Sequence, residues 1–249
     1  MILFDGVALE SIAPVMIEDI RVSPVSINAV SRPRAISAGS VYVRTRYATR
    51  TVSVTFAVIQ DDREARQNAL DAITIWAKSD KAYRLDLPMY ADRHLMAVCT
   101  QRPEPSYRQW WESKLRVTFE CVDDPFWISN AERTAACGDE FFAGGDAPPL
   151  MRIENTFSAT ATNQQYSDGK NIIEFSSIGA GDFVIDINKQ TATLDGVSVM
   201  SAYQAMATIT VETEGVQEEI QVPAHFLQAK TGKQTITGSG TVHFWERWQ

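Results

Sequence analysis

The sequence has few of the residues that commonly mark catalysis, metal binding or a disulfide scaffold. Its 249 residues include only three histidines and three cysteines, namely Cys99, Cys121 and Cys137. No two of these cysteines form a C-x-x-C pair, so the pattern favours neither a zinc site nor a disulfide framework. We therefore expect three reduced, partly buried thiols in a protein that folds in a reducing cytoplasm.

Long apolar segments are also missing. No stretch approaches the roughly 18 uninterrupted apolar residues of a membrane-spanning helix, so we expect no membrane insertion. Residues 1–6 lack the basic run and apolar core of a secretory signal. The composition, at 45% hydrophobic and 22% charged residues, is ordinary for a folded protein and excludes a wholly disordered chain.

The formal net charge of -8 lies entirely in the second half of the chain. Residues 1–128 contain sixteen Lys/Arg and sixteen Asp/Glu, whereas residues 129–249 contain seven and fifteen. Because phosphate contacts need cations, the acidic half disfavours nucleic-acid binding. The asymmetry predicts two units with different surroundings.

Strand patterns dominate the first half. Residues 51–60 and residues 114–121 alternate between apolar and polar side chains, which is typical of strands with one buried face. In the first of these segments, the apolar face consists of Val52, Val54, Phe56 and Val58. Residues 16–20 and 22–27 are predicted to form shorter strands, broken near Pro24.

One segment, residues 63–78, has helical periodicity. Its apolar stripe includes Leu70, Ile73 and Trp76 and predicts packing across a sheet. Asp61 and Glu64 fit a capping box at the start of the helix. We expect this to be the one long helix of the chain.

The second half predicts another β-domain. Residues 131–149 are rich in Ala, Gly and Pro and are interpreted as a linker. Residues 150–249 contain many short strand patterns separated by turns, including a hairpin at Asp195-Gly196, and this spacing favours a β-sandwich. The predicted domains are therefore residues 1–130 and residues 150–249.

Catalytic motifs are scarce. His94, His225 and His243 show no metal-binding spacing, and no G-x-S-x-G elbow is present. The Gly179–Asp182 and Gly232-Lys233 segments lack the remaining residues of nucleotide-binding motifs and are interpreted as turns. The acidic doublets, including Glu218-Glu219, are also interpreted as solvated turns. We predict no enzymatic activity, no cofactor and no metal.

Two features remain as candidate interaction surfaces. The first is an arginine-rich stretch that consists of Arg32, Arg34, Arg44, Arg46 and Arg50. Arg44 and Arg46 would share one side of an extended segment, and guanidinium groups suit carboxylates on a partner chain. Solvated loop charges are the alternative. The second feature is aromatic: Trp110 and Trp111 would point to opposite faces of a strand, so one could anchor an interface or stack on a sugar.

In their order and spacing, these elements resemble the distal tail proteins (Dit family) of long-tailed, non-contractile phages. The resemblance covers nearly the whole chain and is strongest over the first 150 residues. It rests on the arginine segment with GSVYVR at 39–44, the strand at 51–59, the helix ending in Ile75-Trp76, LDLPMYADRH at 85–94, CVDDPFW at 121–127, and the passage from Gly138-Asp139 through Pro148-Pro149 to residues 151–153.

The resemblance implies a mainly β protein. Its N-terminal β-sandwich would carry one helix and an extended arm and would form a hexameric ring, and its C-terminal domain would be a galectin-like β-sandwich. Such a ring is a structural hub at the virion tail tip, assembled in the host bacterial cytoplasm. It would join the tail tube protein to the tail-associated or fibre protein, and its lumen would pass the tape measure and DNA without specific nucleic-acid recognition. The expected subunit-interface residues are Arg32, Arg34, Arg44, Arg46, Trp110 and Trp111.

Three alternatives stay open from the sequence. A carbohydrate-binding adhesin would use the C-terminal β-sandwich for host attachment, with tryptophans as a sugar platform. A glycosidase or cell-wall hydrolase would need carboxylates that converge only in the fold. A tail-tube or baseplate relative with the same N-terminal fold would occupy another position in the tail.

Overall fold

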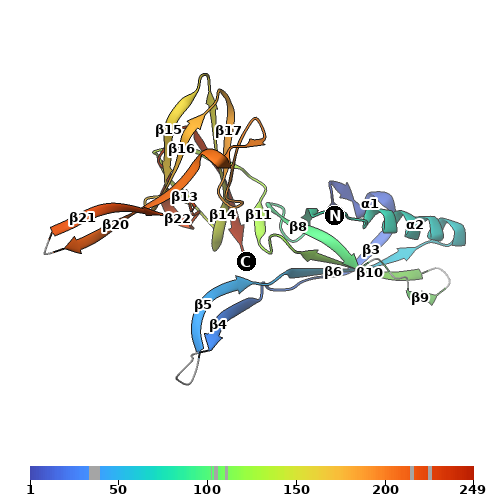
Figure 1. Ribbon diagram of the computed structural model, residues 1–249. Coiled ribbons are helices and arrows are strands. Elements are labelled where there is room, and N and C mark those ends of the chain that lie inside the picture. Colours follow the sequence, from blue (N-terminus) through green and yellow to red (C-terminus); the bar gives the residue numbers. More distant parts are fainter. Residues whose placement is uncertain (34–39, 102, 104–105, 110–111, 214–215, 224–225) are drawn as a thin grey trace. The chain divides into compact units, whose positions relative to one another are not determined.

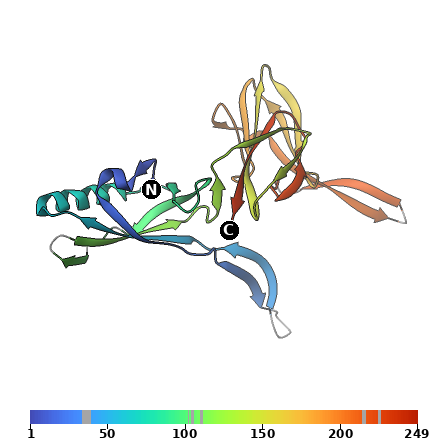
Figure 2. The same cartoon turned by 180° about the vertical axis from the view of Figure 1, so that it is seen from behind.

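The computed structural model describes residues 1–33, 40–101, 103, 106–109, 112–213, 216–223 and 226–249, and within residues 32–46, 104–112 and 204–225 it describes the backbone alone. The chain is mainly β, as predicted, and divides into two compact units, Met1–Trp127 with Gln249 and Ile128–Trp248. Figures 1 and 2 show the elements from opposite sides. The division falls inside β11 (Trp127–Ser129).

The first unit is built on a twisted antiparallel sheet with the strand order β8-β10-β6-β3. Its elements are β1 (Leu3–Phe4), β2 (Val7–Ala8), α1 (Leu9–Ile12), β3 (Val15–Val22), β4 (Ile27–Pro33), β5 (Ser40–Tyr47), β6 (Arg50–Ile59), α2 (Arg63–Trp76), β7 (Tyr83–Asp86), β8 (Arg93–Gln101), β9 (Ser106–Gln109) and β10 (Glu112–Cys121).

Strands β6 and β10 form the centre of this sheet, as their alternating sequences predict. They pair in register over ten residues, from Glu112 opposite Ile59 to Cys121 opposite Arg50. The expected inward positions are buried: Val52, Val54, Phe56 and Val58 on β6 face the core together with apolar residues of β10. This burial fixes the register, since a one-residue slip would expose the whole apolar face.

Helix α2 packs on the sheet through the predicted stripe. Leu70, Ile73 and Trp76 are buried, and the Trp76 and Phe119 rings meet edge to face with centroids 6.0 Å apart. The Trp76 indole also donates a 3.0 Å hydrogen bond to the Val7 carbonyl. The helix ends at Trp76, two residues before the predicted end. The predicted cap is wrong by one residue, because Asp62, not Asp61, accepts the 2.7 Å hydrogen bond from the Ala65 amide.

The second unit contains two sheets and a small ribbon. Its elements are β12 (Arg133–Ala136), β13 (Glu140–Ala143), β14 (Ala147–Phe157), β15 (Ala161–Ser167), β16 (Asn171–Ile178), β17 (Gly181–Asp186), β18 (Thr191–Leu194), β19 (Val197–Ser198), the short 3-10 helix η1 (Met200–Ala202), β20 (Tyr203–Thr213), β21 (Val216–Pro223), β22 (Gly232–Thr235) and β23 (Thr241–Trp248). One sheet has the order β19-β18-β17-β14-β23 with β12 beside β23, the other has the order β15-β16-β20-β21, and β13 pairs with β22.

The linker predicted for residues 131–149 is wrong. This segment forms β12, β13 and the start of β14, all within the second unit. Its glycine and proline residues allow a close approach between strands and a change of register. At Gly145, with φ at +90°, a Cβ would lie 2.1 Å from the Arg247 carbonyl oxygen, and Pro148-Pro149 sit where the β14–β23 register shifts. The predicted hairpin at Asp195-Gly196 is confirmed, with positive φ at both residues.

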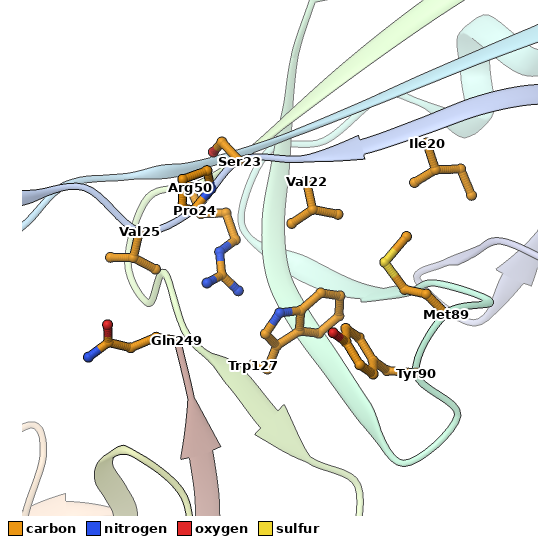
Figure 3. Close-up of a pocket in the computed structure, with 10 residues that line it drawn as sticks. All are labelled: Ile20, Val22, Ser23, Pro24, Val25, Arg50, Met89, Tyr90, Trp127 and Gln249. Atoms are coloured by element: carbon orange, nitrogen blue, oxygen red, sulfur yellow. The ribbon is translucent and has the colours of Figure 1, made fainter.

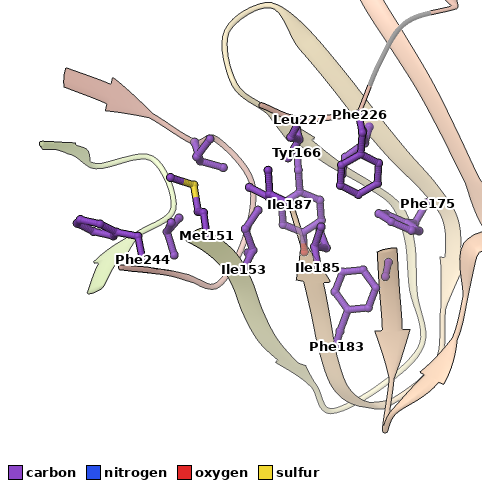
Figure 4. Close-up of a cluster of buried hydrophobic side chains, with 14 of the residues drawn as sticks. Met151, Ile153, Tyr166, Phe175, Phe183, Ile185, Ile187, Phe226, Leu227 and Phe244 are labelled. Atoms are coloured by element: carbon purple, nitrogen blue, oxygen red, sulfur yellow. The ribbon is translucent and has the colours of Figure 1, made fainter. Parts of the chain in front are cut away.

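The core of the second unit lies between its two sheets (Figure 4). Phe183 on β17 meets Phe175 on β16 edge to face, with ring centroids 5.1 Å apart. Ile153 and Ile185, paired across β14 and β17, are fully buried in the same layer. These contacts across the two sheets make the second unit a β-sandwich, in agreement with the predicted fold class.

Candidate assembly surfaces

The arginine segment forms a two-stranded ribbon, β4–β5, that extends from the sheet of the first unit (Figure 1). Its register places Arg46 opposite Asn28, Arg44 opposite Val30 and Arg32 opposite Val41, with an irregularity at Val30/Ser31. Within the part of the chain that the structure describes, β4 and β5 pair only with each other. The arginines therefore lie on a ribbon that has two unpaired edges, and such edges are templates for pairing with another chain.

The base of this ribbon is fixed to the first unit. The Ala48 amide donates to the Ser26 carbonyl at 2.8 Å, and the Thr51 amide donates to the Ser23 hydroxyl at the same distance. The Tyr47 ring meets the Phe126 ring edge to face with centroids 4.9 Å apart. These contacts hold both strands where they leave the sheet.

A hollow of about 540 Å³ lies at the base of the ribbon (Figure 3). Arg50, at the first position of β6, is buried there with 2% of its surface exposed, and its guanidinium carbon lies 5.7 Å from the centre of the Trp127 ring. The Tyr90 and Trp127 rings meet edge to face with centroids 4.8 Å apart. A buried guanidinium held against an aromatic face is a rigid element, so Arg50 anchors the ribbon base.

This role of Arg50 differs from the expectation that it is one charge of the arginine-rich stretch. A signal for it is present in the sequence: Arg50 continues the even-numbered inward positions of β6, two residues before Val52. A charged residue in the inward register of a strand needs a specific partner.

A second ribbon extends from the second unit. Strand β20 pairs with β16 only through residues 203–207, whereas its pairing with β21 continues to Thr213 opposite Val216. Among the described residues, positions 208–213 of β20 therefore pair with β21 alone (Figure 2). The predicted turn at Glu218-Glu219 is wrong, because both residues lie within β21.

Charged side chains surround the His243 ring. Its Nδ1 lies 2.6 Å from Glu132 Oε1 and its Nε2 lies 3.4 Å from Glu154 Oε2, while Arg152 Nε lies 2.7 Å from Glu154 Oε1. Arg152 places one positive charge beside both carboxylates, with its Nη2 lying 3.4 Å from Glu132 Oε1, and these residues tie β14 and β23 to the segment before β12. In the described ranges of the chain, no group of three or more His, Cys, Asp or Glu side chains is arranged to hold a metal ion.

The whole chain matches the solved structure of a phage tail component. The crystal structure of the SPP1 Dit (gp 19.1) protein, described as a paradigm of the hub adsorption apparatus in phages that infect Gram-positive bacteria, matches with a TM-score of 0.68. The two chains are 18% identical, and the match covers 100% of this chain and 98% of the SPP1 protein. This chain has the distal tail protein fold. The resemblance predicted from the sequence is thus confirmed at the level of the fold.

A second match carries no argument because its TM-score is low. The phage P2 baseplate in its activated conformation with Ca contains a chain that is 8% identical, with a TM-score of 0.40, over 92% of this chain and 90% of that chain. No protein-family model and no curated protein matches the sequence. Among the described residues, no helix of this distal tail fold is long and apolar enough to span a membrane.

The predicted interface residues fall in different parts of this fold. Arg32, Arg44 and Arg46 lie on the ribbon, as the predicted arm requires, and their role at an interface stays a prediction. Arg34, Trp110 and Trp111 lie outside the described residues. Phe126, Trp127 and Phe244 belong to the core, since they are at most 5% exposed.

The three cysteines are reduced thiols, as predicted, and none is part of a disulfide. Burial raises the pKa of Cys121 to about 12, an effect that the nearby Arg50 charge only partly opposes, and burial raises the pKa of Cys137 to about 11. Because the thiolate is the reactive form, neither thiol is poised as a nucleophile.

Proposed function

We propose that this protein is a structural hub of a phage tail, in which copies of the chain form a hexameric ring at the distal end of the tail. The observation that supports this proposal is the full-length match to the SPP1 Dit protein, which includes both units. Each copy works by its shape and contacts, with no covalent step. Its place is the virion tail tip, after assembly in the host cytoplasm.

The geometry of the first unit supports self-assembly. A ring closes when one surface patch of each copy binds a different patch of the next and the rotation returns to the start. The β4–β5 ribbon supplies a patch that reaches beyond its own sheet, and its rigid base around Arg50 and Trp127 keeps its direction constant. A constant direction makes each contact repeat the same rotation.

The ring would join two different partners. We expect the tail tube protein on one face and the tail-associated or fibre protein on the other, with the tape measure and later the DNA passing through the lumen. DNA passage of this kind requires no base-specific contacts. Co-purification of the wild-type ring with each partner separately would identify the two faces.

The ribbon arginines provide a direct test. Replacing Arg44 and Arg46 by Glu should reduce the ring to smaller species in light scattering while circular dichroism stays unchanged, because like-charged or unpaired groups at a contact weaken it. The control replaces two exposed lysines of the second unit, Lys170 and Lys189, by Glu and changes the net charge equally. A ring that survives the arginine changes would remove these residues from the interface.

A further inference from the structure

The two ribbons share an incomplete architecture. An isolated two-stranded ribbon is marginally stable in water, and three or more strands or a packed layer are normally needed. Within the described residues, β4–β5 and the outer part of β20–β21 have no third strand. Each therefore presents backbone edges and faces that a partner would stabilise.

The charges of the two ribbons are opposite and unmixed. Residues 27–47 contain four arginines and no Asp, Glu or Lys. Residues 203–223 contain four glutamates and no Asp, Lys or Arg. Among the described residues, Arg32, Arg44 and Arg46 lie on β4 or β5, and Glu212, Glu218 and Glu219 lie on β20 or β21. Each ribbon therefore carries described charges of one sign only, three on each.

We propose that the β4–β5 ribbon of one copy docks on the β20–β21 ribbon of a neighbouring copy. A nucleic acid or an acidic peptide would account for the arginines but would leave the acidic ribbon without a role. A second copy of this chain accounts for both, because every copy carries one ribbon of each sign. Guanidinium groups recognise carboxylates with paired hydrogen bonds, which gives the contact direction as well as attraction.

The dimensions of the ribbons fit this pairing. Strand β5 has eight residues and spans about 26 Å at about 3.3 Å per residue, and the six outer residues of β20 span about 20 Å. Because the two surfaces are different parts of one chain, the contact is head-to-tail and repeats from copy to copy. The inference rests on the proposed hub and names the patch, on the C-terminal unit of the next copy, that receives the β4–β5 ribbon.

A charge-exchange experiment tests the pairing. The arm variant changes Arg32, Arg44 and Arg46 to Glu, and the hairpin variant changes Glu212, Glu218 and Glu219 to Arg. Sedimentation should show self-association at least a hundredfold weaker for each variant alone, since each then carries two ribbons of like charge. An equimolar mixture should associate as the wild type does, because the acidic arm of one variant meets the basic hairpin of the other.

The controls separate pairing between copies from misfolding and from a contact within one chain. Circular dichroism and melting curves establish that both variants fold, and raising the salt from about 50 to 500 mM should weaken the wild type and the mixture alike. A chain with both ribbons reversed should also associate as the wild type does. If that chain associates but the mixture does not, the contact is within one chain and the inference is overturned.

The failure of this inference and the failure of the hub are distinguishable. Six-fold rings that are insensitive to both single reversals would overturn the ribbon pairing and leave the hub standing. Wild-type and mixed-variant association without rings would support the pairing and contradict the hub. No association of the wild type at about 100 μM would overturn the pairing directly.

Discussion

Replacing Asp168 by Ala should destabilise the second unit, because this one carboxylate holds two segments of the chain. Asp168 lies in the turn between β15 and β16. Its Oδ1 accepts hydrogen bonds from the Lys170 and Asn171 amides at 2.9 and 2.8 Å, and its Oδ2 accepts from the Gln228 amide at 2.8 Å and the Asn171 side chain at 3.0 Å. The bond to Gln228 fixes the segment that places Leu227 in the core.

The expected loss of stability follows from the number of hydrogen bonds that Asp168 accepts and from the exposure of its side chain to water. A hydrogen bond to a charged group contributes about 1.5–3 kcal/mol, so three backbone bonds set an upper limit of roughly 9 kcal/mol. Asp168 is only half-buried, and water can replace part of this set. We expect Asp168→Ala to lower the free energy of unfolding by about 2–3 kcal/mol and the melting midpoint by about 6–12 °C. Asp139→Ala, in an exposed turn, should change the free energy by less than about 0.5 kcal/mol.

Urea unfolding measured by tryptophan fluorescence tests the magnitude, and its pH dependence tests the cause. Burial acts to raise the pKa of Asp168, but hydrogen bonds from Asn171, Gln228 and Lys170 outweigh it and hold the pKa below its ordinary value of 3.8. The stabilisation is therefore present above pH 4 and is lost as the pH falls through the lowered pKa of the folded state. The gap between wild type and Asp168→Ala should narrow near pH 2. An equal gap at pH 7 and pH 2, or a variant as stable as Asp139→Ala, would refute the reasoning.

Two further predictions concern the backbone and the thiols. Gly240→Ala should lower the free energy of unfolding in urea by about 2–4 kcal/mol, because φ is +104° and the new Cβ would lie 2.3 Å from the Glu154 carbonyl oxygen. Gly196→Ala, with φ at +78° and open space around the new Cβ, should lower it by only about 1 kcal/mol. Equal losses for the two variants would contradict the steric account. In the folded protein at pH 8, Cys121 should resist alkylation because it is fully buried and its pKa is about 12. The half-buried Cys99 should be alkylated first, as peptide mass spectrometry would detect. Rapid labelling of Cys121 would contradict this expectation and show that its strand opens.

The parts of the fold that the sequence predicts are those with local, repeated signals. The alternation around Val54 identifies β6, and the Leu70–Ile73–Trp76 spacing identifies α2, because burial of one face imposes a period. The first residue of α2, Arg63, agrees with the prediction, but the predicted N-cap is off by one residue because Asp61 and Asp62 are adjacent and equally suited to capping. Only the backbone geometry decides between them.

The parts that fail depend on distant residues. Gly145 and Pro148-Pro149 indicate a linker by composition, but they serve a close approach to Arg247 and a register shift against β23, a strand about 100 residues away. The position of Arg50 in the inward register of β6 can be read from the sequence, but its aromatic partner, Trp127, is distant along the chain and is identified only in the fold. The acidic doublet of the second ribbon suggests a turn for the same reason, since the length of β21 is set by its pairing with β20.

Negative-stain microscopy of the purified protein, with native mass spectrometry of the same sample, tests the central claim most directly. We predict closed six-fold rings with a central hole and a mass of six 27.7 kDa subunits. Two-fold dimers, open filaments or single subunits alone at all concentrations up to about 100 μM would contradict the proposed hub, because none of these species encloses a lumen.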